Sequence, residues 1–536
     1  MAPGRPAGLP AQRRLIAALR DPHAFPHPAA AVELVETHIS WVLLAGDYAY
    51  KIKKALDLGF LDHTTLARRR QSCLEELRLN RRTAADIYLE VVAIAGTPRA
   101  PRLRAIDTGN GGDAGVIEYA VRMRRFDRDQ ELDALVDRGA FGSADAAALG
   151  NMIARFHDAA ARDAAGAFAD PATVLTQALE NFGHLPPAAL PADERALLAP
   201  LQAWTRAEHA RVAPLLAARR RDGRIRECHG DLHLANLVRH DARLVAFDCI
   251  EFAPALRWID VVADLAFTLM DLHLHGRADL ARLVLDAWLA HGGDYAGVPL
   301  LRFYLVYRAM VRVKVAAIRA AQRGPGAADR HAARRARAAH LRLAFALTQR
   351  SPPLLVLTHG LSGAGKSAAS AALIAARDWI RLRSDVERRR LADDGTGAAP
   401  AAPGRYTAAM TERVYRHLAD RADRLVADGW GVVVDATFLR REQRQRFAAL
   451  AAARQVPLVI VALDAPRSLL EARIAARAAH GGDASEATVG VLDLQIAALE
   501  PLDDDERRRC VRVDAALPLD GAALARAVAE RAVALA

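Results

Sequence analysis

The segment "GLSGAGKS" at residues 360–367 constrains the fold of this chain more than any other stretch. It fits the pattern G-x-x-x-x-G-K-[ST], and it lies between an apolar run, "PLLVLTH", and an alanine-rich run, "SAASAALIAAR". A glycine-rich loop between a strand and a helix turns consecutive backbone N–H groups toward a phosphate, and the start of the helix adds about half a positive charge. The setting therefore predicts a nucleotide-binding α/β domain.

The chemistry of such a loop needs its backbone and two of its side chains. We expect the backbone to hold the phosphates of ATP, Lys366 to reach the β- and γ-phosphates, and Ser367 to bind Mg²⁺. ATP and Mg²⁺ are therefore the predicted cofactors. The predicted nucleotide-binding residues are Gly360, Ser362, Gly363, Ala364, Gly365, Lys366 and Ser367.

The sequence pattern changes at Pro352-Pro353, where a helical pattern ends and an extended segment begins. Beyond this point, apolar runs typical of buried strands alternate with helical patterns. Such alternation predicts a parallel, doubly wound sheet with helices on both faces. We therefore predict an α/β P-loop domain over residues 352–536.

Carboxylates and arginines are the candidate catalytic and metal-binding groups of this domain. Asp435 ends the apolar run "GVVVD", where a second Mg²⁺ ligand is expected. Asp385 follows "RLRS" and could accept the proton of an acceptor hydroxyl, although a helix cap fits its position equally well. Arg473 and Arg477 lie one helical turn apart and could close over the γ-phosphate, with a solvated basic helix face as the alternative.

These motifs resemble those of P-loop small-molecule and polynucleotide kinases, including gluconate-kinase-like and zeta-toxin-like proteins. The resemblance covers residues 352–536 and implies a phosphotransferase, with Asp385 near the accepting hydroxyl and Arg473 and Arg477 in a lid. Residues 395–406, "GTGAAPAAPGRY", are expected to be flexible and to lie over the acceptor site. The resemblance implies no particular acceptor.

A second motif, "HGDLHLANLV" at residues 229–238, indicates another way of handling ATP. Asp231 and Asn236 stand five residues apart, and Asp248 ends the apolar run "RLVAFD". In the pattern H-x-D-x-x-x-x-N, the first aspartate accepts the proton of a hydroxyl group. The asparagine and the later aspartate are oxygen ligands suited to Mg²⁺.

Residues upstream supply the remaining parts of such a site. Lys51 and Lys53 alternate with apolar residues in "YAYKIKK", so both project from one face of a predicted strand, and either could bind phosphates. Glu75 or Glu76, in the predicted helix "LARRRQSCLEELRLNRRTA", could form an ion pair with that lysine. A charged edge strand and an ordinary helix surface are the alternatives.

Together these residues resemble the aminoglycoside phosphotransferase-like branch of the kinase fold, which includes choline and homoserine kinases. More closely, the whole chain resembles bacterial two-domain proteins that join such a domain to a P-loop kinase or AAA-family ATPase module. The resemblance implies an α+β kinase-like domain over residues 31–345, with a small lobe over about 31–126 and a large lobe over about 127–345. We expect a flexible segment at residues 1–30. The implied roles are Asp231 as catalytic base, Asn236 and Asp248 as metal ligands, and Lys51 or Lys53, paired with Glu76, as the phosphate-binding lysine.

The chain departs from the protein-kinase pattern at three places. Gly230 stands where H-R-D has arginine, Cys249-Ile250 follow Asp248 in place of Phe-Gly, and no G-x-G-x-x-G precedes "AYK". The first two differences favour a small-molecule acceptor over a protein. The third leaves open a kinase-like domain that only binds nucleotide or substrate.

Several polar residues near this motif have a structural interpretation. Asp260 and Asp264 are interpreted as helix caps or loop anchors rather than acceptor contacts, and His229 and His233 as local hydrogen-bonding residues. A polycationic aminoglycoside would need an acidic pocket. Residues 260–345 contain no evident acidic cluster, so an aminoglycoside is not the expected acceptor.

Composition limits the remaining possibilities. The net charge of +11 would suit nucleic acid, but aromatic residues make up only 5% and are not interleaved with basic ones, so this partner is possible and not favoured. The four cysteines form no C-x-x-C pair, which argues against a disulfide scaffold and a zinc site. No uncharged apolar run reaches about 18 residues, so we expect no membrane segment and a cytoplasmic protein.

The motifs together predict a bifunctional ATP-dependent phosphotransferase that has two Mg²⁺–ATP sites and unidentified small-molecule hydroxyl acceptors. In one alternative, only the P-loop domain is catalytic and the kinase-like domain is a nucleotide- or substrate-binding module. In the other, the chain is a nucleic-acid end kinase or a toxin-like regulator.

Overall fold

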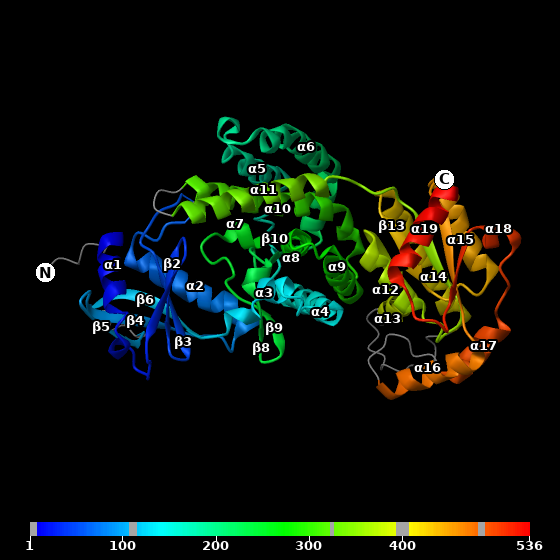
Figure 1. Cartoon of the computed structure of the whole chain (residues 1–536), viewed down its shortest axis with the longest axis horizontal. Helices are drawn as coiled ribbons and strands as arrows, with labels where there is room; N and C mark the ends of the chain where they lie inside the picture. The colour runs from blue at the N-terminus through cyan, green and yellow to red at the C-terminus, as the bar shows by residue number, and fades with distance from the viewer. Residues whose placement is uncertain are drawn as a thin grey trace.

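The computed structural model describes residues 8–59, 61–106, 115–321, 326–392, 407–480 and 488–535, except for the side chains of 477–480. Within these ranges, no helix is both long enough and apolar enough to cross a lipid bilayer. The chain forms two domains that follow one another in sequence (Figure 1). α11 (Ala327–Leu347) ends the first domain and β11 (Leu355–His359) begins the second, so Pro352-Pro353 lies in the segment that connects them.

A six-stranded antiparallel sheet forms the small lobe of the N-terminal domain, in the order β1-β2-β3-β6-β4-β5. A two-residue turn at Gly46-Asp47 joins β2 to β3. α2 packs against the sheet, and the hydroxyl of Thr65 caps it by accepting a hydrogen bond from the Arg68 N–H at 3.2 Å. The elements are β1 (Val32–Glu36), β2 (Ser40–Ala45), β3 (Tyr48–Lys53), α2 (Leu66–Ala84), β4 (Tyr88–Thr97), β5 (Ala100–Ala105) and β6 (Val116–Arg124).

The segment predicted to be flexible, residues 1–30, is folded from residue 8 onward. α1 (Leu9–Ala18) and the 3-10 turn η1 (Pro22–Ala24) pack against the sheet of the small lobe. The prediction was wrong because an abundance of Pro, Ala and Arg obscures an amphipathic helix, whose apolar side chains follow helical spacing. The buried anchors of this segment are Leu15, Ile16, Leu19 and Phe25.

Helices form most of the large lobe, and a short strand–loop–strand unit between α6 and α8 carries the "HGDLHLANLV" motif. β7 pairs with β10 and β8 pairs with β9, so the loop at 228–236 is held between two small antiparallel ladders. The helices are α3 (Leu132–Asp137), α4 (Ser143–Ala159), α5 (Pro171–Gly183), α6 (Ala192–Arg221), α7 (Pro254–Arg257), α8 (Val261–Leu274), α9 (Ala278–Gly292) and α10 (Leu301–Ala321). The strands are β7 (Ile225–Glu227), β8 (Leu237–His240), β9 (Arg243–Ala246) and β10 (Trp258–Asp260), and the 3-10 turns are η2 (Arg128–Gln130), η3 (Pro187–Ala189), η4 (Leu234–Asn236) and η5 (Tyr295–Leu300).

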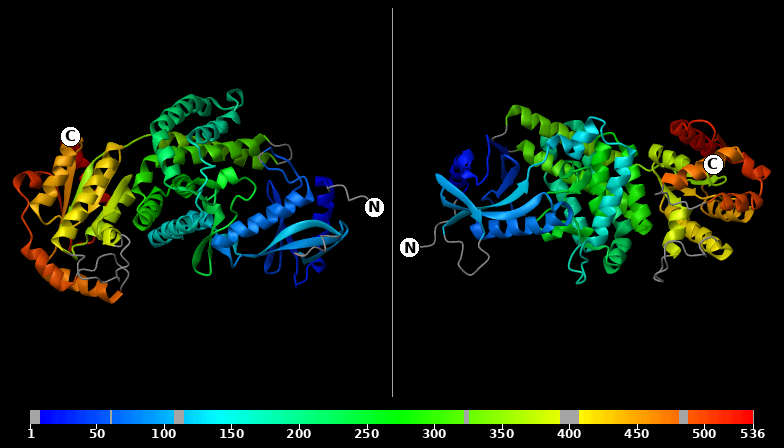
Figure 2. Two further views of the ribbon diagram at one scale, coloured as in Figure 1. Left: turned by 180° about the vertical axis from the view of Figure 1, so that it is seen from behind. Right: turned by 90° about the horizontal axis from the view of Figure 1, so that it is seen from below.

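The C-terminal domain contains five parallel strands in the order β12-β13-β11-β14-β15, with helices on both faces (Figure 2). This architecture confirms the predicted doubly wound α/β fold. The strand order reverses next to β11, and ligands bind at such a reversal, at the carboxyl ends of the strands. The elements after β11 are α12 (Lys366–Ala376), β12 (Trp379–Arg383), α13 (Ser384–Ala392), α14 (Ala408–Ala427), β13 (Gly431–Asp435), α15 (Arg441–Ala453), β14 (Leu458–Asp464), α16 (Arg467–His480), α17 (Val489–Ala497), α18 (Asp504–Arg508), β15 (Cys510–Asp514) and α19 (Gly521–Leu535).

The two domains pack together through α9 and η5 of the large lobe and α12 and α14 of the P-loop domain. Buried apolar side chains form one continuous cluster that runs from the large lobe into one face of the parallel sheet. At the contact, the Tyr295 hydroxyl donates to the Arg381 carbonyl oxygen at 3.3 Å, and the Arg302 guanidinium lies 4.3 Å from the centre of the Trp430 ring. An apolar contact of this kind holds the two domains in one arrangement.

Candidate active sites

Lys51 lies in the interior of the small-lobe sheet, because β3 pairs with β2 on one side and with β6 on the other. The alternative of a charged edge strand is therefore wrong. Lys51 Nζ lies 2.7 Å from Glu76 Oε1 and also donates to Asp248 Oδ1. Burial favours the neutral lysine, but Asp248 and Glu76 outweigh burial and hold the pKa of Lys51 well above its usual value. One ammonium group thus joins β3, α2 and the segment after β9.

Lys53 projects from the same face as Lys51 but is fully enclosed. Its Nζ lies 2.5 Å from Glu76 Oε2 and also contacts Glu251, and 0% of its side chain is exposed. By contrast, Asp248, the second partner of Lys51, keeps 43% of its side chain exposed. Of the two lysines, Lys51 therefore lies on the side from which a nucleotide could approach.

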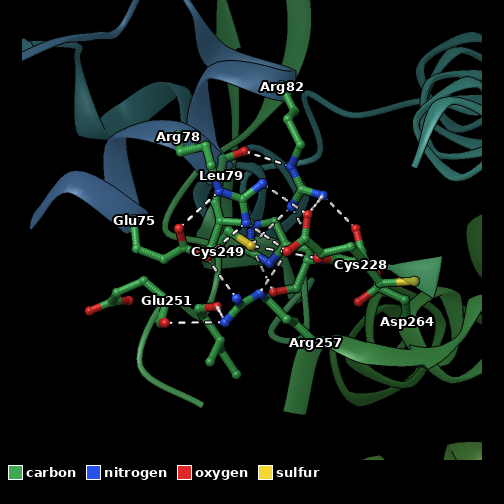
Figure 3. Close-up of polar contacts among 12 residues, drawn as sticks. Glu75, Arg78, Leu79, Arg82, Cys228, Cys249, Glu251, Arg257 and Asp264 are labelled. Carbon is green, nitrogen blue, oxygen red and sulfur yellow. Dashed lines mark hydrogen bonds and ion pairs between the residues drawn. The ribbon is translucent and has the colours of Figure 1, made fainter. Parts of the chain in front are cut away.

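Only one of the two candidate glutamates faces the lysines. Burial raises the pKa of Glu76, but Lys51 and Lys53 outweigh burial, so the pKa is lowered and the carboxylate stays ionised. Glu75 points elsewhere and accepts hydrogen bonds from Arg78 and Arg257, each at 2.7 Å (Figure 3). Glu76 is therefore the ion-pair partner, and Glu75 fastens α2 to the large lobe.

An arginine network ties α2 to the segment that leads into the "HGDLHLANLV" loop (Figure 3). Arg78 Nη2 lies 2.6 Å from Glu227 Oε1, and Arg82 Nη2 donates to the Cys228 carbonyl oxygen at 3.2 Å. Sequence reasoning missed this network because its partners are 149 and 146 residues apart along the chain. The helix that carries Glu76 is thereby fixed relative to the loop that carries Asp231.

The "HGDLHLANLV" loop brings Asp231 and Asn236 into contact. Asn236 Nδ2 donates to the Asp231 carbonyl oxygen at 2.9 Å and to Asp231 Oδ2 at 3.2 Å, which leaves the amide oxygen of Asn236 for another partner. His233 Nε2 lies 3.4 Å from Asp231 Oδ2. Burial raises the pKa of Asp231, but His233 outweighs burial and lowers the pKa overall. Asp231 is therefore an ionised acceptor at neutral pH.

Asp248 is held against the same loop by its neighbours. The Phe247 N–H donates to the Asn236 carbonyl oxygen at 3.0 Å, and the Ile250 N–H donates to that of His229 at 3.1 Å. Asp248 has a φ of 63°, in the left-handed region, and its N–H donates to the Tyr88 hydroxyl at 3.1 Å. Non-glycine residues adopt this conformation mostly where the surrounding structure requires it, often at functional sites.

Gly230 replaces the arginine of H-R-D for a steric reason. Its φ is 88°, and a Cβ at this position would lie 2.8 Å from the carbonyl oxygen of Leu256. Any L side chain would be strained here. The departure from the protein-kinase pattern is therefore a requirement of this loop.

Asp260 and Asp264 anchor the structure around the loop, in agreement with the interpretation from sequence. Asp260 caps α8 and forms a two-pronged ion pair with Arg219, at 2.7 and 2.8 Å. Asp264 accepts hydrogen bonds from the backbone N–H groups of His229 and Gly230, at 3.1 and 2.8 Å. Both carboxylates are thus occupied by structural contacts.

Asp264 also belongs to a buried group of three potential metal ligands, together with His157 and Cys228. His157 Nε2 contacts Asp264 Oδ2 at 3.2 Å, and its Nδ1 accepts a hydrogen bond from Trp288 Nε1 at 3.1 Å. Because both ring nitrogens of His157 are engaged, this group supports the loop and does not offer a metal site.

The P-loop has the predicted strand–loop–helix setting, between β11 and α12. Gly363 has a φ of 85°, and a Cβ there would lie 2.8 Å from the Leu470 carbonyl oxygen, so the loop passes close to α16. Lys366 Nζ curls back over the loop and donates to the Leu361 carbonyl oxygen at 2.8 Å. The Ser362 N–H donates to Gln495 Oε1 at 2.8 Å, a contact from α17 that sequence reasoning missed.

The candidate carboxylates lie at the carboxyl edge of the parallel sheet. Asp435 ends β13, is buried, and accepts a hydrogen bond from Ser370 Oγ at 3.0 Å. In the neighbouring strand, Arg383 is level with Asp435, and Asp385 follows two residues later in the first turn of α13. The positive end of the helix dipole also favours a carboxylate at this position. Asp385 could therefore stabilise the start of α13, and its proposed catalytic role remains a prediction.

The candidate lid arginines belong to α16. Arg473 Nη1 lies 3.4 Å from the Gly363 carbonyl oxygen, and its Nη2 donates to that of Ala515 at 2.7 Å, so Arg473 does not lie on a purely solvated face. Arg477 lies one turn further along α16, and its side chain is outside the described residues. Residues 395–406, expected over the acceptor site, are also outside the described residues.

Arg381 is a residue of this site that no sequence motif indicated. From β12, its Nη1 donates to the Ser367 carbonyl oxygen at 3.1 Å and to Ser370 Oγ at 3.2 Å. Its Nε donates to Asp286 Oδ1, on α9 of the other domain, at 3.0 Å. The Arg381 guanidinium group therefore links the P-loop helix to Asp286 of the N-terminal domain.

Parts of this chain are similar to known proteins. Residues 355–502 match the family model described as an AAA domain. Among solved structures, a gluconokinase from Sinorhizobium meliloti 1021 is 26% identical, covering 35% of this chain and 93% of its own, with a TM-score of 0.24. A choline/ethanolamine kinase family protein from Mesorhizobium loti is 14% identical, covering 63% of this chain and 99% of its own, with a TM-score of 0.36.

Relatives that match most of the chain come from mycobacteria. The uncharacterized proteins Rv2004c of Mycobacterium tuberculosis and Mb2027c of Mycobacterium bovis are each 31% identical over 467 residues, which is 85% of this chain and 88% of theirs. Both domains are included in a match of this length. The chain therefore belongs to the same family as these mycobacterial proteins, and its C-terminal domain carries the match to the AAA domain model.

Proposed function

We propose that the chain is a bifunctional ATP-dependent phosphotransferase, with one Mg²⁺–ATP site in each domain and a small-molecule hydroxyl acceptor at each. The observation that carries this proposal is the position of Lys51, which contacts Glu76 and Asp248 at the same time. Phosphoryl transfer is catalysed mainly by positioning and by stabilisation of charge. A lysine held by a helix glutamate beside a metal-binding aspartate provides both.

In the N-terminal domain, Lys51 binds the α- and β-phosphates of ATP, and Asp231 accepts the proton of the acceptor hydroxyl. The Asp248 carboxylate and the free amide oxygen of Asn236 are hard oxygen ligands, which fit Mg²⁺. When bound, Mg²⁺ would neutralise charge on the β- and γ-phosphates. Lys53 keeps Glu76 in place and does not touch the nucleotide.

In the C-terminal domain, the backbone of the P-loop and Lys366 bind the phosphates, while Ser367 and Asp435 provide the Mg²⁺ ligands. Their position at the carboxyl edge of the sheet supports this assignment. Asp385 accepts the acceptor proton. Arg473, which already contacts the P-loop carbonyl of Gly363, stabilises charge on the γ-phosphate, with Arg477 on the same helix.

One observation favours the alternative in which only the P-loop domain is catalytic. The turn before β3 contains only Gly46-Asp47, because Ala45 pairs directly with Tyr48. A kinase usually covers the phosphates with a longer glycine-rich loop. A hairpin this tight can shield less of the nucleotide, as expected for a domain that binds nucleotide without transferring its phosphate.

The two possibilities can be separated with the purified full chain, γ-labelled ATP and a pool of metabolites. Asp231→Asn and Lys366→Ala, made singly, should each remove a different set of labelled products. Asp137→Asn, a change of an exposed carboxylate in the large lobe, is the matched control and should remove none. If Asp231→Asn leaves every product in place, the N-terminal domain is a binding module.

A further inference from the structure

A row of three arginines runs along one face of α10. Arg308, Arg312 and Arg319 fall within about 40° of one another on a helix of 3.6 residues per turn. Arg308 is buried, whereas Arg312 is half-buried and Arg319 is exposed. The row thus passes from the interior of the large lobe to its surface.

The buried end of the row lies against the catalytic loop. Arg308 Nε donates to the Ala263 carbonyl oxygen at 2.9 Å, and its guanidinium lies 5.0 Å from the centre of the Phe267 ring. The Phe267 and His233 rings form an edge-to-face pair, with 5.6 Å between ring centres. Because His233 is 3.4 Å from the Asp231 carboxylate, the row begins two side chains away from the proposed base.

The outer two arginines extend from Asp231 toward the small lobe. Arg312 adds to the effect of His233 in lowering the pKa of Asp231 against the effect of burial. Burial and the charge of Arg319 both lower the pKa of His38, which follows β1 in the small lobe. The end of α10 accordingly reaches the small lobe (Figure 1, Figure 2). Arg312 and Arg319, on the same face of α10 as Arg308, therefore both lie close enough to Asp231 for their charges to interact with its carboxylate.

No carboxylate in the described part of the chain forms an ion pair or hydrogen bond with Arg312 or Arg319. Asp231 is the carboxylate whose charge acts on Arg319, and three other acidic groups around the loop and the small lobe have partners of their own. Glu36 pairs with Lys54, Glu131 pairs with Arg128, and Asp271 accepts a hydrogen bond from the Leu234 N–H. Partial desolvation of the guanidinium group and the charge of Arg312 both lower the pKa of Arg319, whereas the charge of Asp231 raises it, so the two guanidinium groups repel one another and Asp231 attracts Arg319. An anion placed between the two guanidinium groups would relieve this repulsion.

We infer that the acceptor of the N-terminal site carries an anionic group, a phosphate monoester or a carboxylate, which Arg312 and Arg319 bind while its hydroxyl lies at Asp231. This inference rests on the proposed phosphotransferase function. Guanidinium groups bind both anions through paired N–H donors. A cationic acceptor such as an aminoglycoside or choline would instead be repelled by the row.

The reaction then places a second anionic group on the acceptor. The hydroxyl oxygen forms a bond to the γ-phosphorus as the bond from that phosphorus to the β–γ bridging oxygen breaks. The hydroxyl proton passes to Asp231, and ADP leaves. The arginines take no part in bond making, and they fix the distance between the bound anion and the reacting hydroxyl.

The first test uses Lys366→Ala as background, so that only the N-terminal site turns over ATP. Acceptors of matched carbon skeleton are compared in four forms: the neutral alcohol, its phosphomonoester, its carboxylic acid and its amine. Labelled product should form from an anionic member. Arg312→Gln should raise the KM for that acceptor by roughly 10- to 100-fold and leave the KM for ATP unchanged. A neutral or amine member as the best acceptor would overturn the inference.

The second test does not depend on turnover. Phenylglyoxal labelling of arginines in the full chain, read by mass spectrometry, is repeated with orthophosphate, with acetate, and with chloride at equal ionic strength. Orthophosphate or acetate should slow the labelling of Arg312 and Arg319 several-fold, and the better of the two identifies the anion. Arg335, exposed on α11, is the matched control and should label equally throughout.

The two tests separate the inference from the proposed function. Protection of Arg312 and Arg319 without any phosphorylated acceptor would support the anion site and argue against catalysis by this domain. Equal labelling of both arginines in all three salts would reject the anion site, whether or not the domain transfers phosphate. Arg335→Gln should leave the acceptor KM unchanged, and a rise equal to that of Arg312→Gln would also reject the site.

Discussion

Arg381 of the P-loop domain and Asp286 of the N-terminal domain form a two-pronged ion pair across the domain boundary, with Nε 3.0 Å from Oδ1. Both side chains are largely buried, at 9% and 12% exposure. The same guanidinium group contacts Ser370, and Ser370 in turn contacts Asp435. A carboxylate of one domain thus supports the proposed metal site of the other.

Asp286→Asn should therefore lower both the stability of the chain and the activity of the P-loop domain. Loss of one partner of a buried ion pair costs roughly 3–5 kcal/mol, because the other charge stays buried. We expect a lower unfolding midpoint in urea and, with Asp231→Asn as background, slower ATP turnover. Asp279→Asn, at a half-buried site on the same helix whose carboxylate pairs with Arg277, is the control and should change stability by less than about 1 kcal/mol. Equal midpoints for the two variants would show that the ion pair contributes little.

Lys51 and Lys53 should respond differently to substitution by methionine, which keeps the length of the side chain. Lys51→Met removes the proposed phosphate contact and should lower turnover at the N-terminal site by roughly 10²–10³-fold. Lys53→Met leaves Glu251 buried without its lysine and should mainly destabilise the chain. Turnover measured with Lys366→Ala as background, together with thermal unfolding, separates the two effects. The assignment of Lys51 fails if Lys53→Met, in its folded form, loses more turnover than Lys51→Met.

The free energy of unfolding should depend on pH at low pH because of the buried carboxylate of Asp264. Burial raises its pKa, but hydrogen bonds from the His157 ring and the His229 backbone N–H help to outweigh burial, and the pKa is lowered from 3.8 to about 2. The ionised carboxylate therefore contributes on the order of 2 kcal/mol above about pH 4, and this contribution is lost as the pH falls toward 2. The difference in unfolding free energy between wild type and Asp264→Asn should thus be larger at pH 7 than at pH 2.5. A constant difference would contradict the lowered pKa.

Gly230→Ala should disrupt the "HGDLHLANLV" loop even though it adds only a methyl group. The new Cβ would approach the Leu256 carbonyl oxygen, and alanine is strained at a φ of 88°. We expect a loss of roughly 1–3 kcal/mol in stability and a strong fall in N-terminal turnover. Gly183→Ala, at a helix end with free space around its Cβ, is the control and should be nearly neutral. Full activity in Gly230→Ala would show that the loop tolerates another conformation.

The parts of the two sites that could be predicted from sequence are those that local conformation determines. The P-loop needs its glycines within one strand–loop–helix unit, so its pattern is readable from "GLSGAGKS" alone. The period of a strand placed Lys51 and Lys53 on one face. The strand period could not show which lysine contacts Asp248, because Asp248 lies 197 residues from Lys51 along the chain.

The contacts that sequence reasoning missed are long-range and are made by ordinary surface residue types. Arg381 and Asp286 belong to different domains, and neither stands in a motif. Arg78 and Arg82 read as one face of a charged helix until their partners near Glu227 are known. The N-terminal segment was misjudged for a related reason, since the apolar surface that buries Leu15 and Phe25 is formed by strands further along the chain.

The continuous apolar cluster across the domain boundary has a consequence for how this protein can change over time. If the chain were cut near Pro352, each fragment would expose the apolar surface that is now buried between the domains, and each would tend to aggregate. Splitting the gene into two separate genes would therefore be harmful unless polar residues first replaced the apolar ones on the contact surface of each domain. The two halves must be made, folded and degraded in equal number.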